Sequence, residues 1–245
     1  MNIALISGAS SGIGYEIAKE LDKLSLDELW VVSSTEEKLM KLSCELHTKS
    51  RIFALDLSKN ESFSVISSAL NAEKPCIKYL VCSAGVGFNG EFDRLSLEQI
   101  SKMIDINTLA LTQLTKLSLP YLSSGSRILE IASSAGFMPQ PYFSVYAATK
   151  SYVITFSRAL REELKKQKIY VTAVCPGPVD TPFFSGLENV KEYKKKYAIS
   201  PYKVAKGALK ASKRKKALYI PTFSMKMVHL ASKFVPTSMI LRFYK

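Results

Sequence analysis

A tyrosine and a lysine four residues apart, Tyr146 and Lys150, are the side chains of this sequence whose types and spacing best suit acid–base chemistry. In a helix this interval places both side chains on one face. A neighbouring ammonium favours the phenolate form of a tyrosine, whose ordinary pKa is about 10, so the pair could move protons near neutral pH. The same spacing also occurs where a lysine extends past an interfacial tyrosine to water. The pair alone leaves both interpretations open.

Two polar residues elsewhere could complete such a site. The apolar run Arg127–Ala132 ends in Ser133, thirteen residues before Tyr146, and predicts a strand that delivers a hydroxyl to a sheet edge. Asn107 falls near the middle of an amphipathic helix expected over about 96–119. An amide in such a helix is usually a buried group satisfied by hydrogen bonds, and a role in the site is the alternative.

A glycine-rich turn near the start predicts a phosphate site. The strand-like run Asn2–Ile6 leads into SGASSGIG, Ser7–Gly14, which continues as a sequence with helical periodicity. Glycines let the backbone approach a pyrophosphate, and a helix N-terminus offers free N–H groups and a positive dipole end. A tight structural turn is the alternative, but a strand before and a helix after favour a dinucleotide site.

The end of the second predicted strand, Glu28–Val32, bears on the choice of cofactor. The next residues are Ser33, Ser34 and Thr35, with Lys38 one turn further. In a dinucleotide fold an acidic side chain at this place holds the ribose diol of NAD. No acidic side chain stands at 33–35, and hydroxyls with a lysine tolerate a 2′-phosphate better. We therefore expect NADP(H), with NAD(H) as the alternative.

Strand and helix patterns alternate along the rest of the chain. Further predicted strands are Arg51–Leu55, Ile77–Cys82, Arg127–Ala132, Ile169–Cys175 and Ala217–Ile220. The predicted helices between and after them are Glu36–Leu46, Ser62–Ala72, Ser96–Leu119, Tyr142–Lys166 and Tyr202–Ser212. This alternation predicts an α/β protein with a Rossmann-type, doubly wound parallel sheet of about seven strands. We expect one domain over residues 1–220, with a short helical lid at 183–200.

Residues 221–245 predict a basic amphipathic extension of that domain. Apolar residues recur at helical spacing, and Lys226, Lys233, Arg242 and Lys245 are interspersed. The segment is too short and too charged to span a bilayer. It could lie on a membrane surface, but packing against a second subunit or bracing the domain is favoured.

Composition excludes several classes of protein. The formal charge of +13 could suit nucleic acid, but the basic residues gather in Lys191–Lys196 and Lys203–Lys216, which predicts solvated helical faces and no nucleic-acid partner. The cysteines are Cys44, Cys76, Cys82 and Cys175. They form no CxxC pair and lie far from His47 and His229, so neither a metal site nor a disulfide framework is expected. We expect a cytoplasmic protein, with the inner face of a membrane as the alternative location.

Taken together, the motifs resemble those of the short-chain dehydrogenase/reductase family over about Ile3–Ile220. In order, they are SGASSGIG, the SAG of Ser83–Gly85, Asn107, Ser133, Tyr146 with Lys150, and PGPVDT from Pro176. The resemblance implies an NAD(P)-dependent oxidoreductase that interconverts a ketone or aldehyde and an alcohol by hydride transfer. It also implies a homodimer or homotetramer and a small, in some members hydrophobic, carbonyl or alcohol substrate.

The resemblance assigns roles to four residues. It implies that Tyr146 exchanges a proton with the substrate oxygen, that Lys150 lowers the tyrosine pKa and binds the nicotinamide ribose, and that Ser133 holds the substrate oxygen. Asn107 would bind a water that relays protons. Implied cofactor contacts are Gly8, Ser10, Ser11, Gly12, Ile13, Gly14, Ser33, Ser34, Thr35, Asp56, Leu57, Ser83, Ala84, Gly85, Tyr146, Lys150, Pro176, Gly177, Val179 and Thr181.

The sequence departs from the family pattern at two places. Ser7 stands where a threonine is usual, and Ser83 stands where an asparagine is usual. Serine cannot supply the donor and acceptor pair of an amide, so we expect altered local rigidity without lost cofactor binding. The alternative function is a dinucleotide-binding regulatory or scaffolding protein that acts through its basic tail. A broken set of four catalytic residues would mark it, and this sequence has all four.

Overall fold

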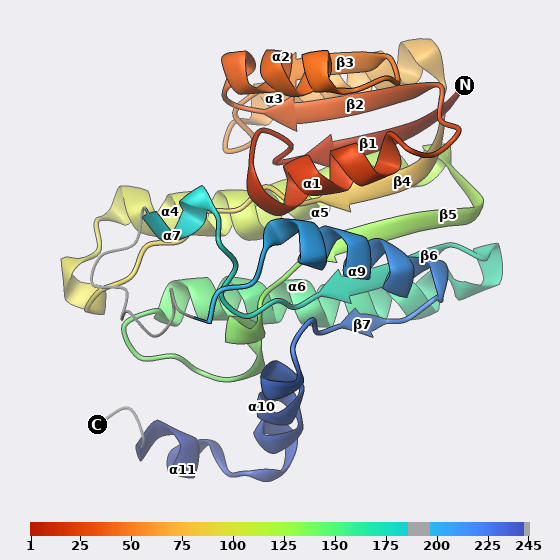
Figure 1. Cartoon of the computed structure of the whole chain (residues 1–245). Coiled ribbons are helices and arrows are strands. Elements are labelled where there is room, and N and C mark those ends of the chain that lie inside the picture. The colour runs from red at the N-terminus through yellow and green to blue at the C-terminus, as the bar shows by residue number, and fades with distance from the viewer. Residues whose placement is uncertain (186–196, 243–245) are drawn as a thin grey trace.

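The computed structural model describes residues 1–185 and 197–242, and its strands form one parallel sheet (Figure 1). The order across the sheet is β3-β2-β1-β4-β5-β6-β7. The strands are β1 (Asn2–Ser7), β2 (Glu28–Ser33), β3 (Ser50–Ala54), β4 (Cys76–Cys82), β5 (Leu122–Ile131), β6 (Tyr170–Val174) and β7 (Leu218–Tyr219). The predicted Rossmann-type sheet of seven strands is confirmed.

Helices cover both faces of the sheet. They are α1 (Gly12–Leu21), α2 (Glu36–Glu45), α3 (Asn60–Glu73), α4 (Leu97–Ile104), α5 (Leu111–Ser118), α6 (Ser144–Glu163), α7 (Pro182–Ser185), α9 (Pro201–Lys213), α10 (Phe223–Phe234) and α11 (Thr237–Arg242). Strands β1 and β2 are almost wholly buried, as expected for parallel strands covered on both sides. Alternate strand residues pack with α1, α2 and α9 on one face and with α3, α5 and α6 on the other.

The strand order reverses between β1 and β4. Strand β1 pairs with β2 on one side and with β4 on the other, and every pairing in the sheet is parallel. The carboxyl ends of all the strands therefore meet at one edge. In open α/β sheets the crevice at such a switch point is the usual ligand site. Residues that follow β1, β4, β5 and β6 are thus candidates for one shared site.

The helix predicted over Ser96–Leu119 is not regular. It begins as α4 and continues as α5, but Asp105–Ala110 between them forms a π-helical turn. Such turns widen the helix by one residue and often occur at functional sites. Here the turn contains Asn107, whose side chain hydrogen-bonds the backbone of Val86 in the loop after β4.

Strand β5 also differs from its prediction, since it begins at Leu122, five residues before the predicted start at Arg127. Leu122 pairs with Ile77, and the Ser126 hydroxyl donates to the Ile77 carbonyl at 2.6 Å, which extends the ladder past Gly125. The predicted lid, 183–200, falls mostly outside the described residues, because 186–196 are not described. Within residues 1–185 and 197–242, no helix is long and apolar enough to cross a membrane.

Candidate active site

Helix α6 places Tyr146 and Lys150 in the interior. The Lys150 side chain is not at the surface, since the residue is only 5% exposed. Its Nζ donates to the carbonyl of Ile131 at 2.9 Å and lies 5.7 Å from the centroid of the Tyr146 ring. A lysine that merely extends to water would be exposed, so that interpretation of the pair is wrong.

Ser133 reaches the same place from the end of β5. Its Oγ accepts a hydrogen bond from the Ala135 amide at 3.1 Å and thereby caps a 3-10 turn, Ser134–Phe137. The Ser133 side chain also lies close enough to the Tyr146 phenol to lower its pKa. The strand therefore delivers a hydroxyl to the tyrosine, as the spacing in the sequence predicts.

Asn107 approaches from the π-helical turn and is 1% exposed. Its Nδ2 donates to the Val86 carbonyl at 2.8 Å and to the Thr149 hydroxyl at 3.1 Å, while its Oδ1 accepts from the Val86 amide at 2.9 Å. A Cβ added at Gly85 would lie 3.2 Å from Asn107 Oδ1 and 3.4 Å from Lys150 Nζ. The loop after β4 thus runs between Asn107 and Lys150, and the four predicted catalytic residues surround one point.

The electrostatics of the pair differ from the expectation. Burial raises the pKa of Tyr146 to about 12, and the Ser133 side chain opposes that shift. Burial lowers the pKa of Lys150 to about 8, opposed by Cys175 and Glu130. The expectation that Lys150 lowers the tyrosine pKa is not met here. The ammonium bonds the Ile131 carbonyl, and desolvation of the buried phenol dominates.

Sequence reasoning missed a buried carboxyl beside this site. Glu130 is fully buried in β5, and Thr115 donates to its Oε1 at 3.0 Å. Its Oε2 has no hydrogen-bond partner among the described residues. Burial raises its pKa to about 7, opposed by hydrogen bonds from Thr115 and Cys82 and by the charge of Lys150. The sequence contained one signal for this buried carboxyl, namely an acidic residue inside the apolar run Arg127–Ala132.

An apolar wall around Tyr146 was also missed. Phe143 stacks on the Tyr146 ring with centroids 4.3 Å apart, and Phe183 lies tilted at 5.4 Å. Met103 and Phe88 pack in the same cluster. Sequence periodicity cannot bring these residues together, because they come from four separate segments.

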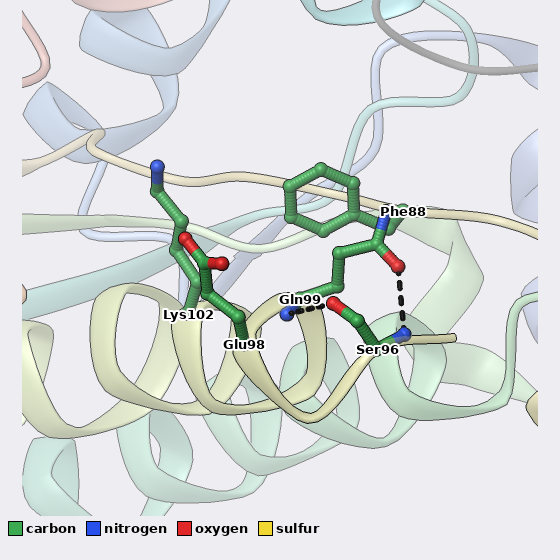
Figure 2. A pocket seen from close by; sticks show the side chains of 5 residues that line it. All are labelled: Phe88, Ser96, Glu98, Gln99 and Lys102. Carbon is green, nitrogen blue, oxygen red and sulfur yellow. Dashed lines mark hydrogen bonds between the residues drawn. The ribbon is translucent and has the colours of Figure 1, made fainter.

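Phe88 also borders a surface hollow at the start of α4 (Figure 2). Ser96 and Gln99 line this hollow, and their side chains bond each other's backbone amides as a capping box. Glu98 and Lys102 stand along its other side (Figure 2). The hollow therefore adjoins the apolar wall of Tyr146 and has a charged rim.

The glycine-rich turn has the shape that a dinucleotide needs. Gly8 has a φ of +66°, and a Cβ there would lie 2.5 Å from the Ala84 amide nitrogen. A Cβ at Gly14 would collide with the Gly8 carbonyl. At the start of α1 the Ser11 side chain makes no capping hydrogen bond, and the first turn carries no acidic residue. The glycines let the turn pack closely against the loop after β4, and the uncapped N–H groups at the start of α1 make Gly8–Gly14 a cradle that fits a pyrophosphate.

Several predicted cofactor residues meet around this turn. The Ser33 hydroxyl donates to Ser10 at 2.7 Å, and a Cβ at Gly12 would lie 3.0 Å from the Thr181 methyl. The Ser7 hydroxyl accepts from the amides of Ser83 at 3.2 Å and Ala84 at 3.3 Å. The serine that replaces the usual threonine thus still ties β1 to the loop after β4.

Other predicted cofactor residues have different surroundings. The Asp56 carboxylate accepts from the Ser58 amide and hydroxyl, which lower its pKa, and Leu57 is buried in the core. Ser34 is exposed, and Thr35 precedes α2. Ile13, in the first turn of α1, packs against the core. Pro176 accepts from the Ser134 amide, Gly177 contacts α10, and Val179 bridges Ile199. The structure does not bring this second group to one point.

Comparisons with known proteins agree with this geometry. The family model described as short chain dehydrogenase matches residues 2–192. An uncharacterized oxidoreductase of Staphylococcus epidermidis is 31% identical over 188 residues, covering 76% of this chain and 81% of that protein. The very-long-chain 3-oxoacyl-CoA reductase of Rattus norvegicus is 32% identical over 185 residues, covering 71% of this chain and 58% of that enzyme.

Solved structures show the same fold. A short-chain dehydrogenase from Sphingobium yanoikuyae in complex with NADPH matches with a TM-score of 0.82 and 26% identity, covering 95% of this chain and 93% of that one. A short chain dehydrogenase/reductase from Burkholderia phymatum in complex with NAD matches with a TM-score of 0.83 and 18% identity, covering 94% and 92%. This chain is an oxidoreductase of the short-chain dehydrogenase family.

Proposed function

We propose that this chain reduces a carbonyl to an alcohol with NADPH, and that Ser133, Tyr146, Lys150 and Asn107 form the catalytic group. The observation that carries the proposal is their convergence from three separate segments, namely the end of β5, the π-helical turn and α6. A buried lysine, a buried tyrosine, a serine beside that tyrosine and a buried asparagine meet where the parallel strands end. The cradle at Gly8–Gly14 opens at the same edge of the sheet.

The acid–base step follows from the tyrosine pKa. When bound, the dihydronicotinamide supplies a hydride to the substrate carbon. A Tyr146 whose pKa is raised to about 12 keeps its proton at neutral pH and is ready to donate it to the carbonyl oxygen. The Ser133 hydroxyl, beside the same phenol, holds the substrate oxygen in line for that transfer.

In this proposal Lys150 binds the nicotinamide ribose and places a positive charge near the phenol. With a pKa of about 8 it is mostly charged at neutral pH, and its ammonium lies over the Tyr146 ring. Asn107 uses its amide to hold Val86, and so fixes the loop that runs beside Lys150. In this proposal the Asn107 side chain positions the loop after β4. A water that relays protons past Asn107 would then bind to backbone groups of the π-helical turn that the wider helix leaves without hydrogen bonds.

NADPH is favoured over NADH by the chemistry at the end of β2. No acidic side chain stands at 33–35, and Lys38 is exposed one turn into α2. The solved structures do not choose between the cofactors, because one holds NADPH and another holds NAD. Glu36 and Glu37 in the first turn of α2 oppose NADPH, so we expect a moderate preference.

The surroundings of Tyr146 favour an apolar substrate. Phe143, Phe183 and Phe88 offer aromatic surface to a bulky ketone or a 3-oxoacyl thioester. The similarity to very-long-chain 3-oxoacyl-CoA reductases supports the thioester, although this chain spans 58% of the rat enzyme's length. We further propose a homodimer or homotetramer, supported by exposed apolar residues on α4, the π-helical turn and α6, namely Ile104, Leu109 and Tyr152.

The test is a screen of ketones, 3-oxoacyl thioesters, sugars and steroids by oxidation of NADPH. The proposal expects turnover with at least one apolar carbonyl, and faster turnover as the apolar chain lengthens. Tight NADPH binding without turnover on any class would instead favour a dinucleotide-binding regulatory or scaffolding role.

A further inference from the structure

Helix α10 has two opposite faces, and only one of them is used within the chain. On the inner face His229 lies against Phe137 with ring centroids 4.4 Å apart. Met225 packs on the core and lies within reach of Gly177, where a Cβ would be 3.0 Å from its Cγ. The helix is therefore fixed to the turn Ser134–Phe137 that follows Ser133. This face accounts for the bracing role expected from the sequence.

The outer face carries an unpartnered apolar stripe. It consists of Phe223, Met227, Leu230 and Phe234, which are 76%, 48%, 50% and 78% exposed. They follow one another at intervals of four, three and four residues, so they form one line along the helix. Met239 of α11 is exposed as well, at 52%. Figure 1 shows α10 and α11 outside the helix layers that cover the sheet.

Positive charge flanks the stripe without acidic residues. Lys226 and Lys233 are exposed, and their separation of seven residues places them on one side of α10. Arg242 ends α11, and the sequence from 221 to 245 contains no aspartate or glutamate. Burial lowers the pKa of His229, and Lys233 and Arg158 add to that shift, so Arg158 of α6 brings a further positive charge near α10.

We propose that α10 and α11 form a docking surface for an anionic lipid bilayer. The apolar stripe enters the boundary between headgroups and acyl chains, and the flanking lysines contact anionic headgroups. This inference is independent of the reaction proposed above, because it rests on a face of the protein that the catalytic group does not use.

Charge favours the bilayer over a second copy of the chain. In a two-fold contact the same surface lies on both partners, so two stripes would bring Lys226 and Lys233 of each copy together. No carboxylate of the segment could compensate that repulsion. An anionic membrane supplies the missing negative charge. Contact of α10 with Ser134–Phe137 would also hold the bilayer near the sheet edge that bears Ser133.

The experiment measures flotation of the full chain with vesicles of phosphatidylcholine alone and of phosphatidylcholine with about 30% phosphatidylserine. One double variant, Phe223→Ser with Phe234→Ser, removes the ends of the stripe. A second, Lys226→Gln with Lys233→Gln, removes the flanking charge. The matched control is Phe92→Ser with Leu97→Ser, which removes two exposed apolar side chains, 64% and 82% exposed, from a different surface.

We expect binding to the anionic vesicles, a drop of at least tenfold in the stripe variant, and a drop of roughly fivefold per lysine in the charge variant. The control should bind like the parent chain, and circular dichroism should show all variants folded. Equal behaviour of all variants, or no binding to anionic vesicles, would overturn the proposal. Light scattering measures the oligomeric state of each variant. If the parent chain were a dimer and only the stripe variant were a monomer, the stripe would be the contact with a second copy and not with a bilayer.

Discussion

Substituting alanine for Gly8 should damage the fold and the cofactor site through two separable effects. Gly8 has a φ of +66°, a region that costs a non-glycine residue about 1–2 kcal/mol. An added Cβ would also lie 2.5 Å from the Ala84 nitrogen and 2.7 Å from the Ser83 carbonyl carbon. Both contacts are with backbone, which cannot rotate away. Overpacking of this kind costs about 1–3 kcal/mol.

Two other glycines separate these effects. Gly125 has a φ of +93°, and a Cβ there meets nothing within 4 Å, so Gly125→Ala tests the backbone term alone. Gly12 has a φ of +60°, and its Cβ would meet the Thr181 side chain, 3.0 Å from the methyl and 3.4 Å from the Cβ, which can shift. We expect Gly8→Ala to lose about 2–5 kcal/mol of unfolding free energy, and each of the other two about 1–2 kcal/mol.

Urea unfolding and NADPH titration by fluorescence provide the two readouts. Gly8→Ala should unfold at a lower urea concentration than Gly125→Ala. Gly12→Ala should match Gly125→Ala in stability but bind NADPH more weakly, because only Gly12 lies in the proposed cradle. If Gly8→Ala and Gly125→Ala unfolded at the same urea concentration, the close approach of the turn to the loop after β4 would be refuted.

The remaining predictions concern charge, loop position and cofactor choice. The pKa of Glu130 is raised from 4.5 to about 7, so the stability that this group contributes is complete below pH 4.5 and is lost as pH rises through 7. Glu130→Gln should therefore reduce the fall in unfolding free energy between pH 5 and 8 by on the order of 2–3 kcal/mol. An unchanged dependence of the unfolding free energy on pH would contradict this prediction. The same variant should move the alkaline limb of kcat/KM to lower pH, because Glu130 raises the pKa of Lys150; a limb that stays in place would show that Lys150 does not set it. Asn107→Ala should cost about 2–4 kcal/mol in urea unfolding, since three hydrogen bonds are lost and both backbone groups of Val86 are released. Asn71→Ala on α3 should cost under about 1 kcal/mol, because Asn71 is exposed and water replaces its two side-chain hydrogen bonds. Lys38→Glu should weaken NADPH binding about threefold to tenfold with little effect on NADH, and equal effects on both would argue against a 2′-phosphate at this place.

Much of the architecture follows from periodicity. The alternation of apolar strands and amphipathic helices predicts the seven parallel strands, and the position of Ser133 at the end of an apolar run predicts its delivery to the sheet edge. These features depend on local sequence and on the rules of parallel sheets, so the chain alone contains them.

Other features depend on tertiary contacts and could not be predicted. The π-helical turn exists where Asn107 reaches Val86 from another segment, and no local pattern indicates it. The direction of the Tyr146 pKa shift follows from complete burial, whereas spacing shows only that a lysine is near. The inner face of α10 depends on Phe137, ninety-two residues before His229. The packing of α10 on this turn therefore could not be predicted from the tail sequence.

The most direct test of the proposed catalysis is Tyr146→Phe, measured with a carbonyl found in the substrate screen. The substitution keeps the ring that stacks on Phe143 and removes only the hydroxyl that donates the proton. The account predicts a loss of about 10²–10⁴-fold in kcat, with NADPH affinity unchanged within about threefold. A variant that turns over at nearly the parent rate would contradict the assignment of Tyr146 as the acid.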